Sequence, residues 1–229
     1  MKILKLPASV SAFLFDMDMT LYTHPEYAQF QIDSPVRRLA RRLGFSFEEM
    51  GEAIAAYRRG WADTHGGQSI SLGNVFTAFG VSIAESIRWR EELYEPTDYL
   101  GEDPRLREAL LALSPPPGRA ALSGTAAALV VVTNNPVSIA EKTLSALGVA
   151  DLFTAIVGLD TCGVSKPHEA PFRRAAELAG VPPANCVSVG DRYDIDIAVP
   201  LELGMGGILV DGVEDVYRLP DLLKITGNE

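Results

Sequence analysis

The sequence predicts an α/β fold in which helices cover both faces of a parallel sheet, with an all-helical segment inserted after the first strand. Five short, continuous apolar runs indicate strands buried on both faces, and helical patterns separate the last four. Strands that alternate with helices are typical of parallel sheets with right-handed crossovers. After the first run, roughly 90 residues show helical periodicity, which is too long for a simple crossover loop.

Each predicted element has a place in the chain. The strands are Ala12–Phe15, Leu129–Val132, Ala155–Leu159, Cys186–Val189 and Gly207–Val210. The helices that separate the last four strands are Val137–Leu147, Ala170–Leu178 and Ile195–Leu203. The candidate helices of the insertion are Pro35–Leu43, Phe47–Tyr57, Val75–Phe79, Ile83–Tyr94 and Pro104–Leu113. We therefore expect a Rossmann-like core formed by residues 1–22 and 114–229, and a helical cap formed by residues 23–113.

Composition and charge narrow the class of protein. Apolar residues make up 47% of the chain and charged residues 22%, as is ordinary for a soluble globular protein. The net charge of −10 disfavours a nucleic-acid partner, because binding to a phosphate backbone needs clustered Lys and Arg. No apolar run reaches the ~18 residues that a membrane span needs. We expect a small phosphorylated metabolite as the partner, and nothing in the sequence indicates the oligomeric state.

The cysteines and the N-terminal stretch bear on the compartment. Cys162 and Cys186 lie in apolar surroundings without CxxC spacing, so we expect two buried thiols in a reducing, cytoplasmic compartment. The apolar N-terminal stretch runs directly into Asp16 without a cleavage site. We therefore expect a first core strand there rather than a signal peptide.

Polar side chains follow the predicted strands at the points where the strands end. They are Asp16 and Asp18 after the first strand, Thr133 and Asn134 after the second, Lys166 after the third, and Asp191 and Asp196 after the fourth. Because the carboxyl ends of parallel strands meet at one edge of a sheet, we expect these side chains to lie close together. Some of them are also residues that commonly form turns or cap helices, which is the alternative interpretation of each taken alone.

The residue types at this edge suit phosphoryl chemistry. Asp16 and Asp191 offer hard oxygen ligands for Mg²⁺, and so many clustered carboxylates would repel one another without a cation. Lys166 would offset the charge of a phosphate, so that the anionic Asp16 can approach phosphorus as a nucleophile. Thr133 and the backbone N–H of Asn134 would donate hydrogen bonds to the phosphoryl oxygens.

Four motifs in this order resemble those of the haloacid dehalogenase superfamily. They are the DxDxT run Asp16 to Thr20, Thr133 after an apolar strand, Lys166-Pro167, and the GDxxxxD run Gly190 to Asp196. Any one motif alone is weak, but four in the correct order, each at a strand end or helix start, are specific. The helical insertion after the first motif resembles the cap of that family. Met19 departs from the pattern, which usually has a small or polar residue such as Gly or Asn at that position.

The resemblance implies a phosphoric monoester hydrolase and a role for each residue. Asp16 would be the nucleophile and a metal ligand. Asp18 would bind Mg²⁺ through its main-chain carbonyl and act first as general acid and then as general base. The other implied roles are phosphoryl binding by Thr133, Asn134 and Lys166, metal binding by Asp191, and orientation of Lys166 or of metal-bound water by Asp196.

Three alternatives remain open at this point. A phosphomutase similar to β-phosphoglucomutase uses the same motifs. A receiver-like phosphate-binding domain also places acidic residues, a Thr and a Lys at strand ends, but it has no helical insertion of this length. A non-catalytic family member would be expected to have lost at least one motif. Asp18 favours hydrolysis, since a general base two residues after the nucleophile assists discharge of an aspartyl-phosphate.

Overall fold

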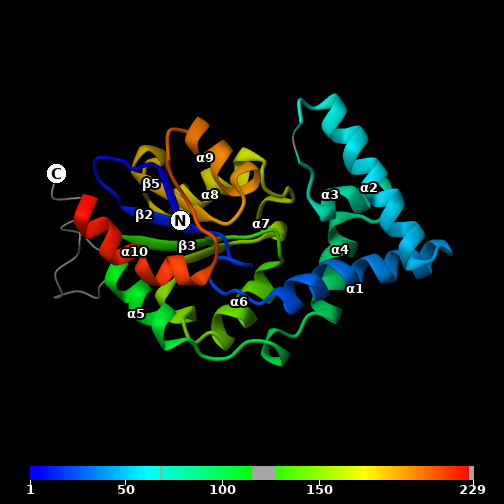
Figure 1. Ribbon diagram of the computed structural model, residues 1–229, viewed down its shortest axis with the longest axis horizontal. Coiled ribbons are helices and arrows are strands. Elements are labelled where there is room, and N and C mark those ends of the chain that lie inside the picture. Colours follow the sequence, from blue (N-terminus) through cyan, green and yellow to red (C-terminus); the bar gives the residue numbers. More distant parts are fainter. Residues whose placement is uncertain (68, 115–126, 227–229) are drawn as a thin grey trace.

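The computed structural model describes residues 1–67, 69–114 and 127–226. Within this part of the chain the core is built on one six-stranded sheet of order β1-β6-β5-β2-β3-β4 (Figure 1). Neighbouring strands are parallel except β1, which pairs antiparallel with β6. The strands are β1 (Lys2–Lys5), β2 (Ala12–Phe15), β3 (Ala128–Val132), β4 (Ala155–Val157), β5 (Cys186–Gly190) and β6 (Gly206–Leu209). The predicted α/β class with a parallel sheet is confirmed.

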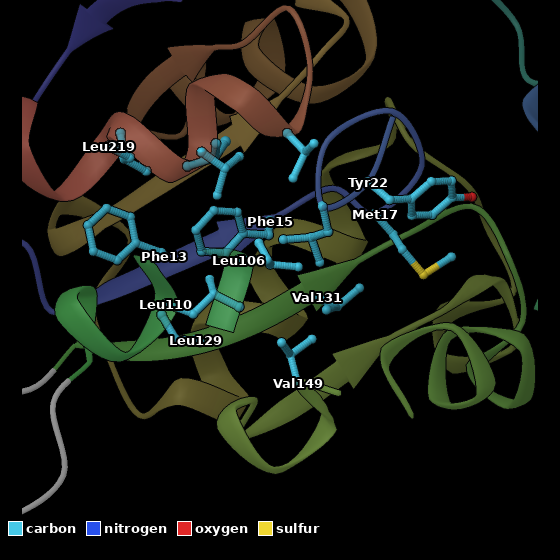
Figure 2. Close-up of a cluster of buried hydrophobic side chains, with 14 of the residues drawn as sticks. Phe13, Phe15, Met17, Tyr22, Leu106, Leu110, Leu129, Val131, Val149 and Leu219 are labelled. Atoms are coloured by element: carbon cyan, nitrogen blue, oxygen red, sulfur yellow. The ribbon is translucent and has the colours of Figure 1, made fainter. Parts of the chain in front are cut away.

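Both faces of the sheet are buried. Successive side chains of β2 point to opposite faces, and each set packs against helices. Phe13 and Phe15 pack with a cluster that includes residues from α5 (Pro104–Leu113), α6 (Val137–Ala146) and α10 (Val213–Thr226). Figure 2 shows part of this cluster. Ala12 and Leu14 pack on the other face, against α8 (Glu169–Ala179). The central strands are therefore apolar throughout, as the continuous runs in the sequence indicated.

The structure adds elements to the predicted core and changes the ends of others. The edge strand β1 and the helix α10 were not predicted. The third predicted strand ends at Val157, because Leu159 begins the short helix α7 (Leu159–Cys162). The helix predicted at Ile195–Leu203 is a π-helical turn, Tyr193–Ile197, followed by α9 (Ala198–Glu202).

The cap has a hydrophobic core of its own. It consists of α1 (Pro25–Leu43), α2 (Phe47–Thr64), α3 (Leu72–Ala78) and α4 (Ile83–Leu93), which stand apart from the sheet in Figure 1. Leu39, Met50, Phe76 and Trp89 belong to its buried cluster. The helix α1 begins at Pro25 rather than at the predicted Pro35, which lies inside the helix and is buried.

The domain boundaries stay a prediction, and we propose one change to them. Residues 23–113 as a cap would include α5, but Leu106 and Leu110 of α5 belong to the cluster under the sheet. Figure 1 shows α5 beside α10 on the core. We therefore place the end of the cap before α5. The exit segment predicted at residues 115–118 lies outside the described residues.

Two further findings concern the predicted compartment. No helix among the described residues is long and apolar enough to cross a membrane. Both cysteines are free; Cys186 is buried, whereas Cys162 is only half-buried, so the expectation of two buried thiols is half right. The cytoplasmic location and the lack of a nucleic-acid partner stay predictions.

Candidate active site

Three adjacent strands bring the predicted residues to one edge of the sheet. The strand β2 lies between β3 and β5, and Phe15 is in register with Val131 and Val189. Asp16 directly follows β2, and its backbone N–H donates to the Val189 carbonyl at 2.8 Å. Thr133 follows β3 and Asp191 follows β5 in the same way. The parallel topology therefore places these strand ends side by side.

Lys166 is the buried cation of this edge. Its side chain is almost fully buried, and Nζ lies 2.6 Å from Oδ1 of Asp16 and 2.6 Å from Oδ1 of Asp196. Burial acts to lower the pKa of the Lys166 ammonium, but the two carboxylates outweigh it and raise that pKa above its usual value. Lys166 is therefore held in its charged form beside Asp16.

Three carboxylates form a cluster around this lysine. Oxygen atoms of Asp16, Asp191 and Asp196 lie within 4.8 Å of one another. Burial raises the pKa of Asp191 to about 7, and the charges of Asp16 and Asp196 act in the same direction. Burial, and then the charge of Asp16, also raise the pKa of Asp196, against the opposing effect of Lys166. The two cations near the cluster, Lys166 and Arg192, do not neutralise three carboxylates. Hard oxygen donors at this spacing fit a small divalent cation.

Asp196 differs from the other two carboxylates in its partners. Its Oδ1 accepts from Lys166, and its Oδ2 accepts from the backbone N–H of Arg192 at 3.1 Å. Gly190 makes room for it, because a Cβ at Gly190 would lie 2.4 Å from the Cβ of Asp196. Asp196 is thus fixed from both sides.

Asp18 is half-buried and accepts hydrogen bonds from three side chains. Its Oδ1 accepts from the Tyr22 hydroxyl and from Nε2 of Gln31 at 2.9 Å, and its Oδ2 accepts from Nδ2 of Asn135 at 3.0 Å. Burial and the charge of Asp16 nevertheless raise the pKa of Asp18. Gln31 belongs to α1, so the cap contributes directly to the surroundings of this carboxyl. Neither Gln31 nor Asn135 was assigned a role from the sequence.

Thr133 and Asn134 lie at the same edge, with partners of their own. The Thr133 hydroxyl accepts from the backbone N–H of Asn135 at 3.1 Å. The Asn134 side chain brackets Lys166, since its Oδ1 accepts from the Lys166 backbone N–H at 2.7 Å and its Nδ2 donates to the Lys166 carbonyl at 3.2 Å. Asn134 thus orients the lysine segment, a function of its side chain that the sequence did not indicate. Phosphoryl binding by either residue stays a prediction.

A pocket of about 510 Å³ opens over this edge, between core and cap. The predicted site residues that line it are Asp16, Asp18, Asn134, Lys166 and Asp191. The cap contributes Gln31, Arg58 and Arg90 among others. Ser71 of the cap and Ser165 of the core join across the pocket wall, with their hydroxyl oxygens 2.7 Å apart. Five of the predicted residues therefore face one pocket.

Arg58 belongs to α2 of the cap. It is exposed, but it also lines the pocket. Burial, and then the charge of Arg192 from the core, lower the pKa of Arg58. The sequence could not indicate this position, because it depends on how the cap lies over the core.

Met19, the departure from the first motif, has a left-handed backbone with φ of 59°. Gly and Asn adopt this conformation readily, whereas a long side chain pays about 1–2 kcal/mol for it. We therefore expect Met19→Asn to raise the free energy of unfolding by ~1 kcal/mol, as measured by urea denaturation. Met19→Leu is the matched control, since it keeps the size and the strain. An equal gain in both variants would show that backbone strain is not the cause.

These features together describe a parallel-sheet protein whose acidic site lies beneath an inserted helical cap. A family model described as haloacid dehalogenase-like hydrolase matches residues 10–204. The chain belongs to this family, and the resemblance inferred from the four motifs is confirmed.

Named relatives match over part of the chain. A phosphoglycolate phosphatase of Neisseria gonorrhoeae is 37% identical over 112 residues, which make up 45% of this chain and 47% of that protein. A phosphoglycolate phosphatase of Xylella fastidiosa is 43% identical over 75 residues, 33% of this chain and 32% of that protein. The matched region spans less than half the length of these relatives.

Solved structures agree over nearly the whole chain. A HAD phosphatase from Thermococcus onnurineus superposes with a TM-score of 0.61 at 22% identity, covering 93% of this chain and 98% of that one. A β-phosphoglucomutase from Clostridium difficile superposes with a TM-score of 0.53 at 17% identity, covering 93% and 99%. At these identities the likeness concerns the fold, and it confirms the Rossmann-like core with a cap.

Proposed function

We propose that the protein is a Mg²⁺-dependent phosphatase that hydrolyses a small phosphate monoester through an aspartyl-phosphate on Asp16. The observation that carries this proposal is the position of Asp16. Its carboxylate faces the pocket, is paired with the buried Lys166, and has Asp18 as a second carboxyl on the same turn. A nucleophile, a cation and an acid–base group thus face one pocket.

In the first step, Asp16 attacks the phosphorus and the bond to the ester oxygen breaks. Lys166 offsets the negative charge of the phosphoryl oxygens, which lets one anion approach another. Asp18 in its protonated form gives a proton to the departing oxygen, so that the alcohol leaves as a neutral molecule. Its raised pKa favours this protonated form.

In the second step, Asp18 acts as a base. Its carboxylate takes a proton from a water molecule, which attacks the phosphorus of the aspartyl-phosphate. The bond between phosphorus and Asp16 breaks, which releases inorganic phosphate and restores the Asp16 carboxylate. Tyr22, Gln31 and Asn135 orient Asp18 for both proton transfers through their hydrogen bonds.

Asp16, Asp191 and the main-chain carbonyl of Asp18 would hold Mg²⁺. The three clustered carboxylates support this assignment, because they supply hard oxygen donors and excess negative charge. When bound, the ion supplies positive charge that draws the phosphate towards Asp16. Asp196 stays outside this ligand set and orients Lys166.

The cap sets the size of the substrate. A pocket of about 510 Å³ is typical of small-molecule sites, and the cap over it leaves no room for a folded phosphoprotein.

The names of the relatives make phosphoglycolate the first candidate. The phosphomutase alternative remains open, because a β-phosphoglucomutase is among the structural neighbours of this chain. A receiver-like domain is disfavoured by the family match.

The test is turnover of p-nitrophenyl phosphate and of phosphoglycolate by the purified protein. We expect release of inorganic phosphate that stops after chelation with EDTA and returns when Mg²⁺ is added. Excess Ca²⁺ should inhibit, because it accepts more ligands at longer distances and would misalign Asp16. Full activity after exhaustive chelation would contradict the metal requirement. Isomerisation of a sugar phosphate without net phosphate release would identify a phosphomutase instead.

A further inference from the structure

Arg90 is a buried cation of the cap that faces the pocket without an acidic partner. It lies on α4, its residue is 6% exposed, and it lines the pocket. No carboxylate of the described residues forms an ion pair with it, whereas the other buried cation of the pocket, Lys166, has two. Its partners are neutral: the Asn134 carbonyl accepts from Nη1 at 3.4 Å, and Tyr94 offers its hydroxyl.

Burying a guanidinium group without a counter-charge is strongly unfavourable. Five N–H donors need acceptors, and the carbonyl and the hydroxyl satisfy only some of them. An anionic group of the ligand would explain this position, because it would supply the missing counter-charge and hydrogen-bond acceptors of the guanidinium.

The position of Arg90 limits how far this anionic group lies from the phosphate. Asn134, whose carbonyl faces Arg90, is the residue expected to donate its backbone N–H to the phosphoryl group. The second anionic group therefore lies only a few bonds from the phosphorus. A carboxylate suits this place, because its two oxygens match the planar fork of arginine.

We propose that Arg90 is a specificity-determining residue that binds the carboxylate of a short phosphorylated hydroxy acid. This inference rests on the proposed phosphatase function and adds the chemical class of the substrate. Arg90 does not take part in the transfer of the phosphoryl group; it raises the affinity for esters that carry a carboxylate next to the phosphate-bearing carbon.

Two substrates of equal length test the proposal. Phosphoglycolate carries a carboxylate where 2-hydroxyethyl phosphate carries a neutral hydroxymethyl group. We expect the kcat/KM of the wild type to be about 100-fold higher for phosphoglycolate. This ratio is the usual effect of losing one buried charged pair on binding. Arg90→Met should remove most of this preference through KM, because the carboxylate is bound equally before and during the reaction. Turnover of 2-hydroxyethyl phosphate should fall much less than that of phosphoglycolate, because this ester has no carboxylate for Arg90 to bind.

Two further variants sharpen the result. Arg88 is an exposed arginine on the same helix, so Arg88→Met is the matched control and should keep the full preference. Arg90→Lys keeps the charge without the fork and should lose about tenfold of the preference. Arg90→Lys also replaces Arg90→Met as the test variant if Arg90→Met does not fold, which thermal unfolding would show.

The outcomes separate this inference from the proposed function. If the wild type hydrolyses both esters equally well, or if Arg90→Met weakens both to the same extent, Arg90 does not bind a carboxylate and the inference is wrong. If no ester is hydrolysed, the proposed function fails. In that case calorimetry still decides on Arg90: phosphoglycolate must bind more tightly than 2-hydroxyethyl phosphate to the wild type and equally to Arg90→Met.

Discussion

Asp16→Asn is expected to lower phosphatase turnover by at least about 10⁴-fold while the protein stays folded. The change removes the nucleophile, because a neutral amide does not attack phosphorus. It also removes one of the three clustered carboxylates, which weakens the binding of Mg²⁺. Lys166 keeps Asp196 as a partner, so the buried cation is not left alone. Initial rates with p-nitrophenyl phosphate and circular dichroism would measure both expectations.

Asp194 provides the control for this substitution. It belongs to the fourth motif and is exposed, so Asp194→Asn removes a carboxylate of that motif without touching the pocket. We expect its turnover to remain close to that of the wild type. Substantial activity of Asp16→Asn, with an unchanged metal requirement, would exclude a covalent route through this residue.

Asp18→Asn is expected to slow turnover by about 10² to 10⁴-fold, which is the usual contribution of general acid–base catalysis. An asparagine neither donates an acidic proton to the leaving group nor takes one from water. It also disturbs the hydrogen bonds, because its amide group meets the donors Tyr22, Gln31 and Asn135 with fewer acceptor sites.

The choice of leaving group separates the two roles of Asp18. p-Nitrophenolate leaves without help from an acid, so formation of the aspartyl-phosphate should slow less with this ester than with an alkyl phosphate. Its breakdown needs the base with every substrate. An equal loss in both steps with both esters would indicate a structural role for Asp18 instead.

The sheet was predictable because its strands are short apolar runs, buried on both faces and separated by helical patterns. Ala12–Phe15 has the predicted bounds, and the other four predicted strands differ only at their ends. The edge strand Lys2–Lys5 escaped notice because lysines flank its two apolar residues and it is covered less fully. The start of α1 was missed because Pro35 looks like a first helical residue.

The core of the site was predictable because each of its residues directly follows a strand or precedes a helix. Asp16, Lys166 and Asp191 gather at one edge in any parallel sheet of this order. Gln31 and Arg90 have no such signature. Their positions in the pocket depend on how the cap packs on the core, and neither a motif nor the periodicity of a helix encodes that contact. The side-chain partners of Asp18 were missed for the same reason.

Detection of a phosphoryl group on Asp16 tests the central claim most directly. Asp18→Asn, mixed with p-nitrophenyl phosphate and Mg²⁺ and quenched in acid within seconds, should carry phosphate on the peptide that contains Asp16, as measured by mass spectrometry. The wild type should show less, because it discharges the intermediate faster, and Asp16→Asn should show none. Phosphate absent from Asp16 in an Asp18→Asn enzyme that still turns over, or found on another residue, would contradict the account.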